Sequence, residues 1–163
     1  MLIFDGNSCI SICLKNSNPY VRLAVEDLRR DFQRTSESCI LPRLVESECE
    51  YSLIIEENAP EAGEPILCES FSIKTEGSKI RISADGYLGT MWGIYTFSER
   101  VLGVDPCYLF NDLEAEKHKS LYFNGEDINE DTDGFAFRGI FINDEDLLTG
   151  WKDGGGIRHQ PTP

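Results

Sequence analysis

The sequence is poor in basic residues. It has 15 Lys and Arg residues against 29 Asp and Glu residues, which gives its 163 residues a formal net charge of -14. Proteins that bind nucleic acid or an anionic membrane surface present clusters of basic side chains to the phosphate groups. The composition therefore argues against both kinds of partner, and we attribute the acidity to solubility.

Long apolar runs are also missing. No stretch approaches the ~20 consecutive apolar residues that a membrane-spanning helix needs. The chain begins Met1-Leu2-Ile3-Phe4 with no basic residue near it, and Asp5 interrupts the apolar run earlier than a signal peptide allows. We therefore expect a cytoplasmic protein.

Metal-binding spacings are absent as well. There are six cysteines but no Cys-x-x-Cys pair, and His118 and His159 lie far from any closely spaced cysteines. Cys9 and Cys13 would lie about 13 Å apart in an extended strand, too far apart for a disulfide. We expect free thiols, no metal and no cofactor.

The first part of the chain alternates between strand-like and helix-like patterns. Cys9–Leu14 alternates in polarity and predicts a strand. Asn18-Pro19 then predicts the start of a helix over Pro19–Arg34, because Asn caps a helix and proline suits its first position. Glu26 and Arg30 lie one turn apart on this helix, a spacing that predicts an ion pair.

Further strand patterns follow this helix. Cys39–Leu41 could form a short strand, and the compact apolar run Tyr51–Ile55 predicts a central strand covered on both faces. Ser70–Thr75 and Lys79–Ala84 alternate on either side of Glu76-Gly77-Ser78, which predicts a hairpin with a glycine-containing turn.

A second helix is predicted over Leu88–Leu102, with Gly103 where a helix-ending glycine belongs. Gly89 and Gly93 leave one strip of this helix without side chains, and we interpret the strip as close packing of the helix on a sheet. The order of elements predicts an α+β fold: a small α/β sandwich, with a mixed sheet and helices on one face.

The later part of the chain is acidic and contains the densest group of reactive side chains. His118–Phe123 could be an edge strand, and Phe135–Ile142 is a second strand-like run. Asn143-Asp144-Glu145-Asp146 follows that run, as active-site residues follow the strands of a (β/α)₈ barrel. Carboxylates and amides bind sugar hydroxyls, and carboxylate pairs hydrolyse glycosides. Helix capping by Asn143 or Asp144 is the alternative interpretation.

Two blocks of sequence resemble glycoside hydrolase family 115, the xylan α-1,2-glucuronidases. Arg138–Glu145, followed by Thr149-Gly150-Trp151, resembles the start of that family's catalytic barrel. Gly89–Glu99, followed by Leu102-Gly103-Val104, is similar to a glycine-rich helix in its N-terminal domain. The order of domains is also similar, because the family has a small α/β domain like the second domain of β-hexosaminidases before its barrel. The chain departs from the family at Pro106–Phe110, where the family has a tryptophan-rich stretch.

The resemblance implies a domain organisation. It gives an N-terminal accessory α/β domain over residues 1–123, an acidic linker over 124–134, and the first strand and turn of a truncated catalytic barrel over 135–163. The catalytic carboxylates are then expected on later barrel strands, so we expect this chain alone to be inactive.

The resemblance also implies a substrate and a set of binding residues. The parent enzyme would remove glucuronic acid or 4-O-methylglucuronic acid from xylan or xylo-oligosaccharides, and could form an oligomer. Asn143 and Asp144 match positions that line the family's glucuronic-acid pocket. Glu99 matches a glutamate that the N-terminal domain brings toward that pocket.

Two other interpretations stay open. The chain could be a non-catalytic carbohydrate-binding or interaction module. It could instead be the accessory domain of another glycosidase, of the family 67 glucuronidase or hexosaminidase type, since these enzymes share the domain type.

Overall fold

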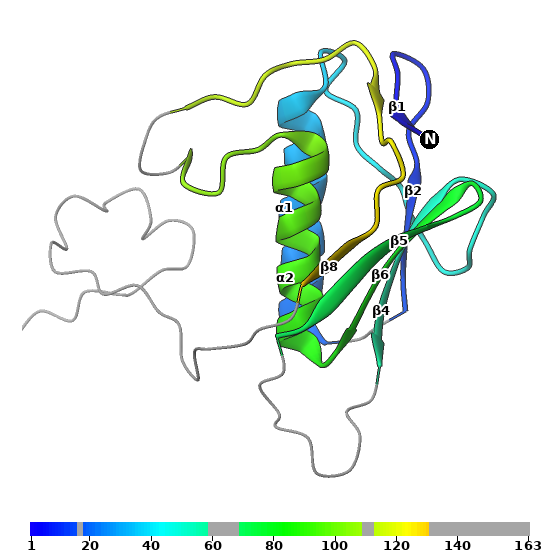
Figure 1. Cartoon of the computed structure of the whole chain (residues 1–163). Coiled ribbons are helices and arrows are strands. Elements are labelled where there is room, and N and C mark those ends of the chain that lie inside the picture. Colours follow the sequence, from blue (N-terminus) through cyan, green and yellow to red (C-terminus); the bar gives the residue numbers. More distant parts are fainter. Residues whose placement is uncertain (16–17, 59–68, 109–112, 131–163) are drawn as a thin grey trace, which may run out of the picture. The chain divides into compact units, whose positions relative to one another are not determined.

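The computed structural model describes residues 1–15, 18–58, 69–108 and 113–130 (Figure 1). The chain divides into two units, Met1–Thr132 and Asp133–Pro163, and every described residue belongs to the first. The predicted strand Phe135–Ile142 and the predicted site residues Asn143 and Asp144 lie outside the described residues.

A six-stranded mixed sheet forms one layer of the fold. Its strand order is β3-β2-β4-β6-β5-β8, in which β3, β2, β4 and β6 run parallel and β5 and β8 each run antiparallel to the preceding neighbour. The strands are β2 (Ser11–Leu14), β3 (Leu44–Val45), β4 (Ser52–Asn58), β5 (Phe71–Glu76), β6 (Lys79–Asp85) and β8 (Ile128–Glu130). The predicted central strand is confirmed in β4, whose Leu53, Ile54 and Ile55 are fully buried.

The predicted hairpin is confirmed in β5 and β6. Ile73 lies opposite Ile82 in the antiparallel register, and Glu76 lies opposite Lys79 at the end of the ladder. Gly77 occupies the turn with a φ of +62°, a left-handed conformation that glycine adopts without steric cost.

The first helix, α1 (Pro19–Thr35), begins where Asn18 and the following proline predict. The Asn18 side chain accepts a hydrogen bond from the backbone N–H of Tyr20 at 2.9 Å, which satisfies a free donor of the first turn. The predicted pairing of Glu26 with Arg30 is wrong. Each side chain instead pairs with a residue three positions away, Glu26 with Arg29 at 2.8 Å and Arg30 with Asp27, a spacing that also makes two residues neighbours on the helix surface.

The second helix, α2 (Tyr87–Phe97), packs beside α1, and the two helices cover one face of the sheet (Figure 1). It continues into the π-helical turn η1 (Ser98–Leu102), where the sequence pattern predicts regular helix. A Cβ atom on Gly89 would lie 2.4 Å from the Ser70 carbonyl oxygen, and one on Gly93 would lie 2.6 Å from Ile82 Cγ2. The predicted close packing of this helix on the sheet is therefore confirmed.

Three predictions about strands need correction. Cys39 has a φ of +50° and donates its N–H to the Ser36 carbonyl oxygen at 3.1 Å, so the chain turns there and the edge strand β3 forms only at Leu44–Val45. The expected strand His118–Phe123 shortens to β7 (Leu121–Tyr122). It pairs with β1 (Leu2–Phe4), which the sequence did not predict, in a separate two-stranded sheet.

The third correction concerns the expected acidic linker. Ile128–Glu130, within residues 124–134, form the edge strand β8, and Ile128 lies opposite Ile73 of β5. Ile128 is the one apolar residue of this three-residue strand, so no alternation marks it in the sequence.

Candidate functional site

Glu99 is the predicted site residue that the structure describes. It is the second residue of η1 and is exposed, while its neighbours Ser98 and Val101 are buried. Gly103 ends the turn with a φ of +77° and donates its N–H to the Glu99 carbonyl oxygen at 3.2 Å. Val104 donates to the Ser98 carbonyl oxygen, also at 3.2 Å, so two backbone hydrogen bonds hold the segment that carries Glu99.

A buried carboxylate lies under this turn. The Ser98 hydroxyl donates a hydrogen bond of 2.6 Å to Asp31 Oδ2, and the Arg34 guanidinium donates one of 2.9 Å to Asp31 Oδ1. Asp31 and Ser98 are only 6% and 4% exposed, so their bond is shielded from water. A buried carboxylate depends on such partners, because its charge loses the solvation of bulk water.

A second polar bond joins the same two helices. The Tyr95 hydroxyl donates to Asp27 Oδ2 at 2.8 Å. Burial, followed by the negative charge of Asp31, raises the pKa of Tyr95 above its ordinary value, so its hydroxyl stays a donor. We call Asp27, Asp31, Tyr95 and Ser98 the polar seam, which runs between α1 and α2 and ends at η1.

No pattern in the sequence identified the polar seam. Asp31 lies three residues after Leu28 and next to Phe32, so it interrupts the apolar stripe of α1. A charged residue at a core position of an otherwise apolar stripe is the signal that could have marked it, because a buried charge needs a partner. Its partner Ser98 carried no such signal.

Two hollows flank the end of α2. One, of about 390 Å³, is lined by the last turn of α1 and by residues that follow η1: Gln33, Arg34, Val104, Asp105, Tyr108, Leu113, Glu114, Ala115 and Lys117. The Arg34 guanidinium lies over the Tyr108 ring, 4.4 Å from its centroid, and so covers one face of the ring. The other hollow, of about 320 Å³, is lined in part by Arg100 and Val101 of η1.

The outer surface of the helix pair exposes large apolar side chains. Tyr20 and Leu23 of α1 are 57% and 64% exposed, and Trp92 and Tyr95 of α2 are 38% and 37% exposed. The Tyr20 ring lies 5.7 Å from that of Tyr87, which links the two helices on this side. We call Tyr20, Leu23, Trp92 and Tyr95 the helix face. Its α2 members lie just before η1, in which Glu99 follows Tyr95 by about one turn.

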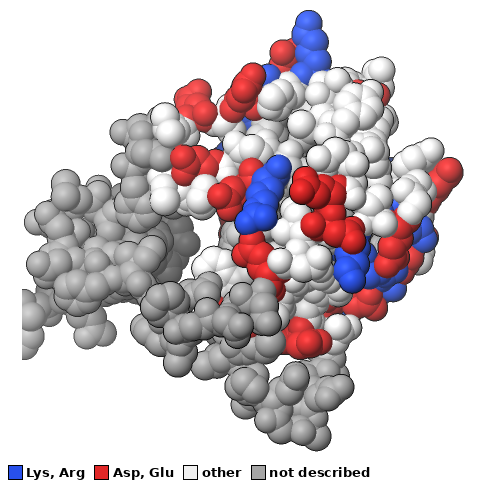
Figure 2. Space-filling model, in the orientation of Figure 1, with Lys and Arg blue, Asp and Glu red and all other residues white. Residues whose placement is uncertain are grey.

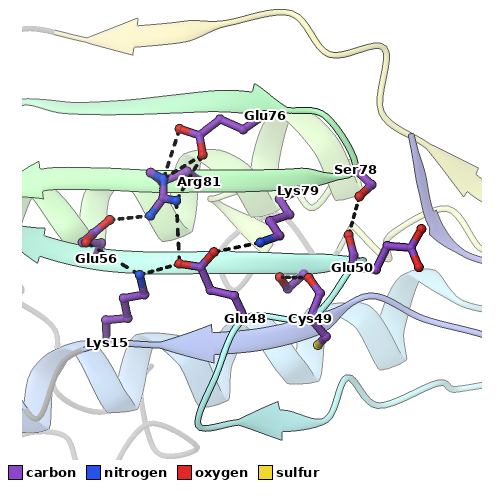
Figure 3. A network of polar contacts seen from close by, with 10 residues as sticks. Lys15, Glu48, Cys49, Glu50, Glu56, Glu76, Ser78, Lys79 and Arg81 are labelled. Carbon is purple, nitrogen blue, oxygen red and sulfur yellow. Dashed lines mark hydrogen bonds and ion pairs between the residues drawn. The ribbon is translucent and has the colours of Figure 1, made fainter.

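The sheet carries a network of ion pairs on the side away from the helices (Figure 3). Glu48 accepts hydrogen bonds from Lys15 and from Lys79, the latter at 2.9 Å, while Arg81 pairs with Glu56 at 2.5 Å and with Glu76 at 3.1 Å. The bonds from Lys15 and Lys79 lower the pKa of Glu48 from 4.5 to about 2. Because each charge here meets an opposite one, we assign this network to stability.

The described residues offer no metal site and no membrane-spanning helix, and the Cys9 thiol among them is not activated. No group of three or more His, Cys, Asp or Glu side chains within it could hold a metal ion, and none of its helices is long and apolar enough to cross a membrane. The five cysteines it contains are free. Burial raises the pKa of the Cys9 thiol to about 12, so this thiol is protonated at neutral pH. Basic side chains on the surface of Figure 2 lie beside acidic ones.

A scan against protein-family models and a search of curated proteins each match nothing. Solved structures do match. One is a family GH115 4-O-methyl-α-glucuronidase with specificity for decorated arabinogalactans, at a TM-score of 0.62 and 19% identity. The match covers 77% of this chain and 18% of that one, so the chain spans less than a fifth of the length of its structural neighbour. At this identity the likeness shows a shared fold.

Two weaker matches are also glycoside hydrolases. A Flavobacterium johnsoniae chitobiase of family GH20 is 21% identical over 79% of this chain and 18% of its own, at a TM-score of 0.48. A GH138 enzyme targeting pectin rhamnogalacturonan II is 12% identical over 56% of this chain and 10% of its own, at 0.45. The expected fold class, a small α/β sandwich with helices on one face of a mixed sheet, is confirmed.

Proposed function

We propose that this chain is the accessory α/β domain of a glycoside hydrolase that removes glucuronic acid or its 4-O-methyl ether from a plant polysaccharide, and that Glu99 reaches toward the sugar. The observation that carries the proposal is the end of α2. There a π-helical turn exposes Glu99 in the same block, Gly89–Glu99, that resembles family 115. Turns of this kind are frequent at functional sites.

The fold supports the proposal by analogy. The same arrangement of sheet and helices occurs in a family GH115 4-O-methyl-α-glucuronidase, where it occupies a small share of a much longer chain. Proteins with the same fold can have different functions, so this likeness only suggests the type of reaction. The evidence for the function must come from the residues of the site.

The helix face supports an accessory role. Apolar side chains gathered on an otherwise charged surface are typical of a surface that contacts another domain or protein. Trp92 and Tyr95 lie on α2, which continues into the turn that carries Glu99, so a domain that covers them would also lie near Glu99.

The proposed catalytic carboxylates lie on other barrel strands, so this chain alone is inactive. Hydrolysis of a glycosidic bond needs two carboxyl groups held at a defined separation. We propose that Asn143 and Asp144 also bind the uronic acid, through its hydroxyl groups.

The coding DNA after codon 163 tests the proposal. We expect it to encode further barrel strands, and the protein expressed from the whole reading frame should release glucuronic acid from glucuronoxylan or from decorated arabinogalactan. The 163-residue chain should release none. Chromatography of the released sugars measures both, and turnover by the short chain would contradict the proposal.

The same assay tests Glu99. In the longer protein, Glu99→Gln should lower kcat/KM by roughly tenfold or more, about the value of one charged hydrogen bond to the sugar. Glu114→Gln is the matched control, because Glu114 is also an exposed glutamate of the accessory domain and lines the hollow beside Tyr108. Equal effects of the two substitutions would argue against a contact by Glu99.

A further inference from the structure

We propose that Asp31 and Ser98 are positioning residues, whose buried hydrogen bond holds the π-helical turn in the one arrangement that points Glu99 outward. The inference rests on the proposed function, because it assigns Glu99 a contact with the sugar. It goes beyond that function by giving a role to a buried carboxylate on the other helix.

Some local interaction must favour the π-helical turn at Ser98–Leu102 over a regular α-helical turn. A π-helical turn holds one more residue than the α-helical turn that precedes it, and it is rarer than α-helix because its geometry is less favourable. Here the turn places Ser98, Val101 and Leu102 toward the protein interior while Glu99 stays exposed. An apolar pair alone could pack in either geometry, but a hydroxyl that must reach a fixed acceptor selects one of them.

The acceptor is fixed from its own side. Asp31 Oδ1 is held by Arg34 at 2.9 Å, and the Arg34 guanidinium in turn lies 4.4 Å from the Tyr108 ring centroid. The Thr35 hydroxyl donates to the Asp31 carbonyl oxygen at 2.9 Å. The carboxylate therefore cannot follow Ser98 if the turn moves, and it acts as a fixed point on α1.

Backbone hydrogen bonds and the burial of Leu102 hold the opposite end of the turn. Gly103 donates to the Glu99 carbonyl oxygen and Val104 to the Ser98 carbonyl oxygen, each at 3.2 Å. If the Ser98 hydroxyl is removed, Asp31 Oδ2 loses its partner in a buried site, where an unpaired oxygen is costly. Water entry or rotation of the carboxylate would then loosen the turn, and the amides of Gly103 and Val104 would report it.

Hydrogen exchange of the 163-residue chain, followed by NMR, tests the first half of the inference. Ser98→Ala should speed exchange at Gly103 and Val104 by about tenfold, the effect of losing one buried hydrogen bond. Thr90→Val is the matched control, since it removes another fully buried hydroxyl of α2, one that donates to the Gly86 carbonyl oxygen at 2.9 Å. It should leave those two amides unchanged. Equal exchange in the wild type and in Ser98→Ala would overturn the inference.

A sugar titration followed by NMR tests the second half. With a xylo-oligosaccharide bearing 4-O-methylglucuronic acid, chemical shift changes should appear near Glu99 in the wild type. The affinity obtained from them should fall about tenfold in both Glu99→Gln and Ser98→Ala, but not in Thr90→Val. A loss in Glu99→Gln with none in Ser98→Ala would overturn the positioning role. If the wild type shows no shifts, the sugar contact fails, and the exchange result then decides whether the bond holds the turn.

Discussion

Substitution of Gly89 by alanine tests how closely the helix layer lies on the sheet. A Cβ atom at this position would lie 2.4 Å from the Ser70 carbonyl oxygen and 3.0 Å from the Ala84 Cβ atom. Both atoms belong to the sheet side of the contact, and the nearer one is backbone. The substitution therefore cannot be accommodated by rotating a neighbouring side chain.

Two opposing terms set the size of the effect. Replacing glycine by alanine inside a helix stabilises it by about 1 kcal/mol when nothing is in the way. Forcing an extra methyl group into a packed interior costs about 1–3 kcal/mol, and a backbone contact puts Gly89 at or above the upper end of that range. We expect a net loss of about 2 kcal/mol at Gly89. At Gly93 we expect about 1 kcal/mol, because the nearest atom is the end of the Ile82 side chain.

Urea unfolding of the 163-residue chain, followed by circular dichroism, measures the difference. The midpoint should fall while the slope m stays constant, which identifies a change in stability. Gly6→Ala is the control, since a Cβ atom there would meet nothing within 4 Å. Its stability should change by less than about 0.5 kcal/mol.

A rise in the unfolding midpoint would contradict the close contact at Gly89. If Gly89→Ala raised the unfolding midpoint, helix propensity would outweigh the contact, and the helix would not lie against the Ser70 carbonyl oxygen as described. A lower midpoint together with a changed m would instead indicate altered compactness.

Three further predictions concern stability. Asn18→Ala should cost about 1 kcal/mol in urea unfolding, because it removes the cap of α1, and Asn18→Ser should recover most of it. Gly103→Ala should cost about 1–2 kcal/mol by the same measurement, because its φ of +77° strains any side chain, and Gly6→Ala again serves as the control. Acid should weaken the fold through Glu48, whose folded pKa of about 2 lies below the ordinary 4.5. Its stabilisation is present above about pH 5 and is lost as the pH falls toward 2. Glu48→Gln should flatten that part of a plot of unfolding midpoint against pH, and an unchanged plot would contradict the assignment.

Elements that depend on near neighbours in the chain were predictable. The helix start at Asn18 follows from a side chain that reaches the backbone two residues away. The hairpin follows from two alternating runs that a glycine-containing turn brings together. The glycine strip of α2 also predicted close packing correctly, since a helix bears glycines at this cost only where a neighbour needs the space.

Elements that depend on distant residues were not predictable. β1 is a strand because residues 2–4 meet β7 about 120 positions later, and β8 forms because the edge of β5 is open to it. Short strands of two or three residues carry too little periodicity to be recognised without their partner.

The residues of the candidate site also fall into these two groups, those marked by the local sequence and those that depend on distant partners. Glu99 was identified from a block of sequence, and the structure describes it as exposed on a π-helical turn. Neither Asp31 nor Ser98 was identified, because a hydrogen bond across 67 positions leaves no mark in the local pattern. The roles of Glu99, Asn143 and Asp144 in sugar binding all remain predictions.

The sequence by itself therefore determined the two helices, the central strand and the hairpin, because periodicity, capping and turn chemistry act between neighbours in the chain. Only the tertiary structure decided the order of the strands, the charge network around Glu48, and the polar seam beneath Glu99. Those features need the sheet and both helices to be assembled first, since a buried carboxylate and a strand edge gain their partners only when distant segments meet.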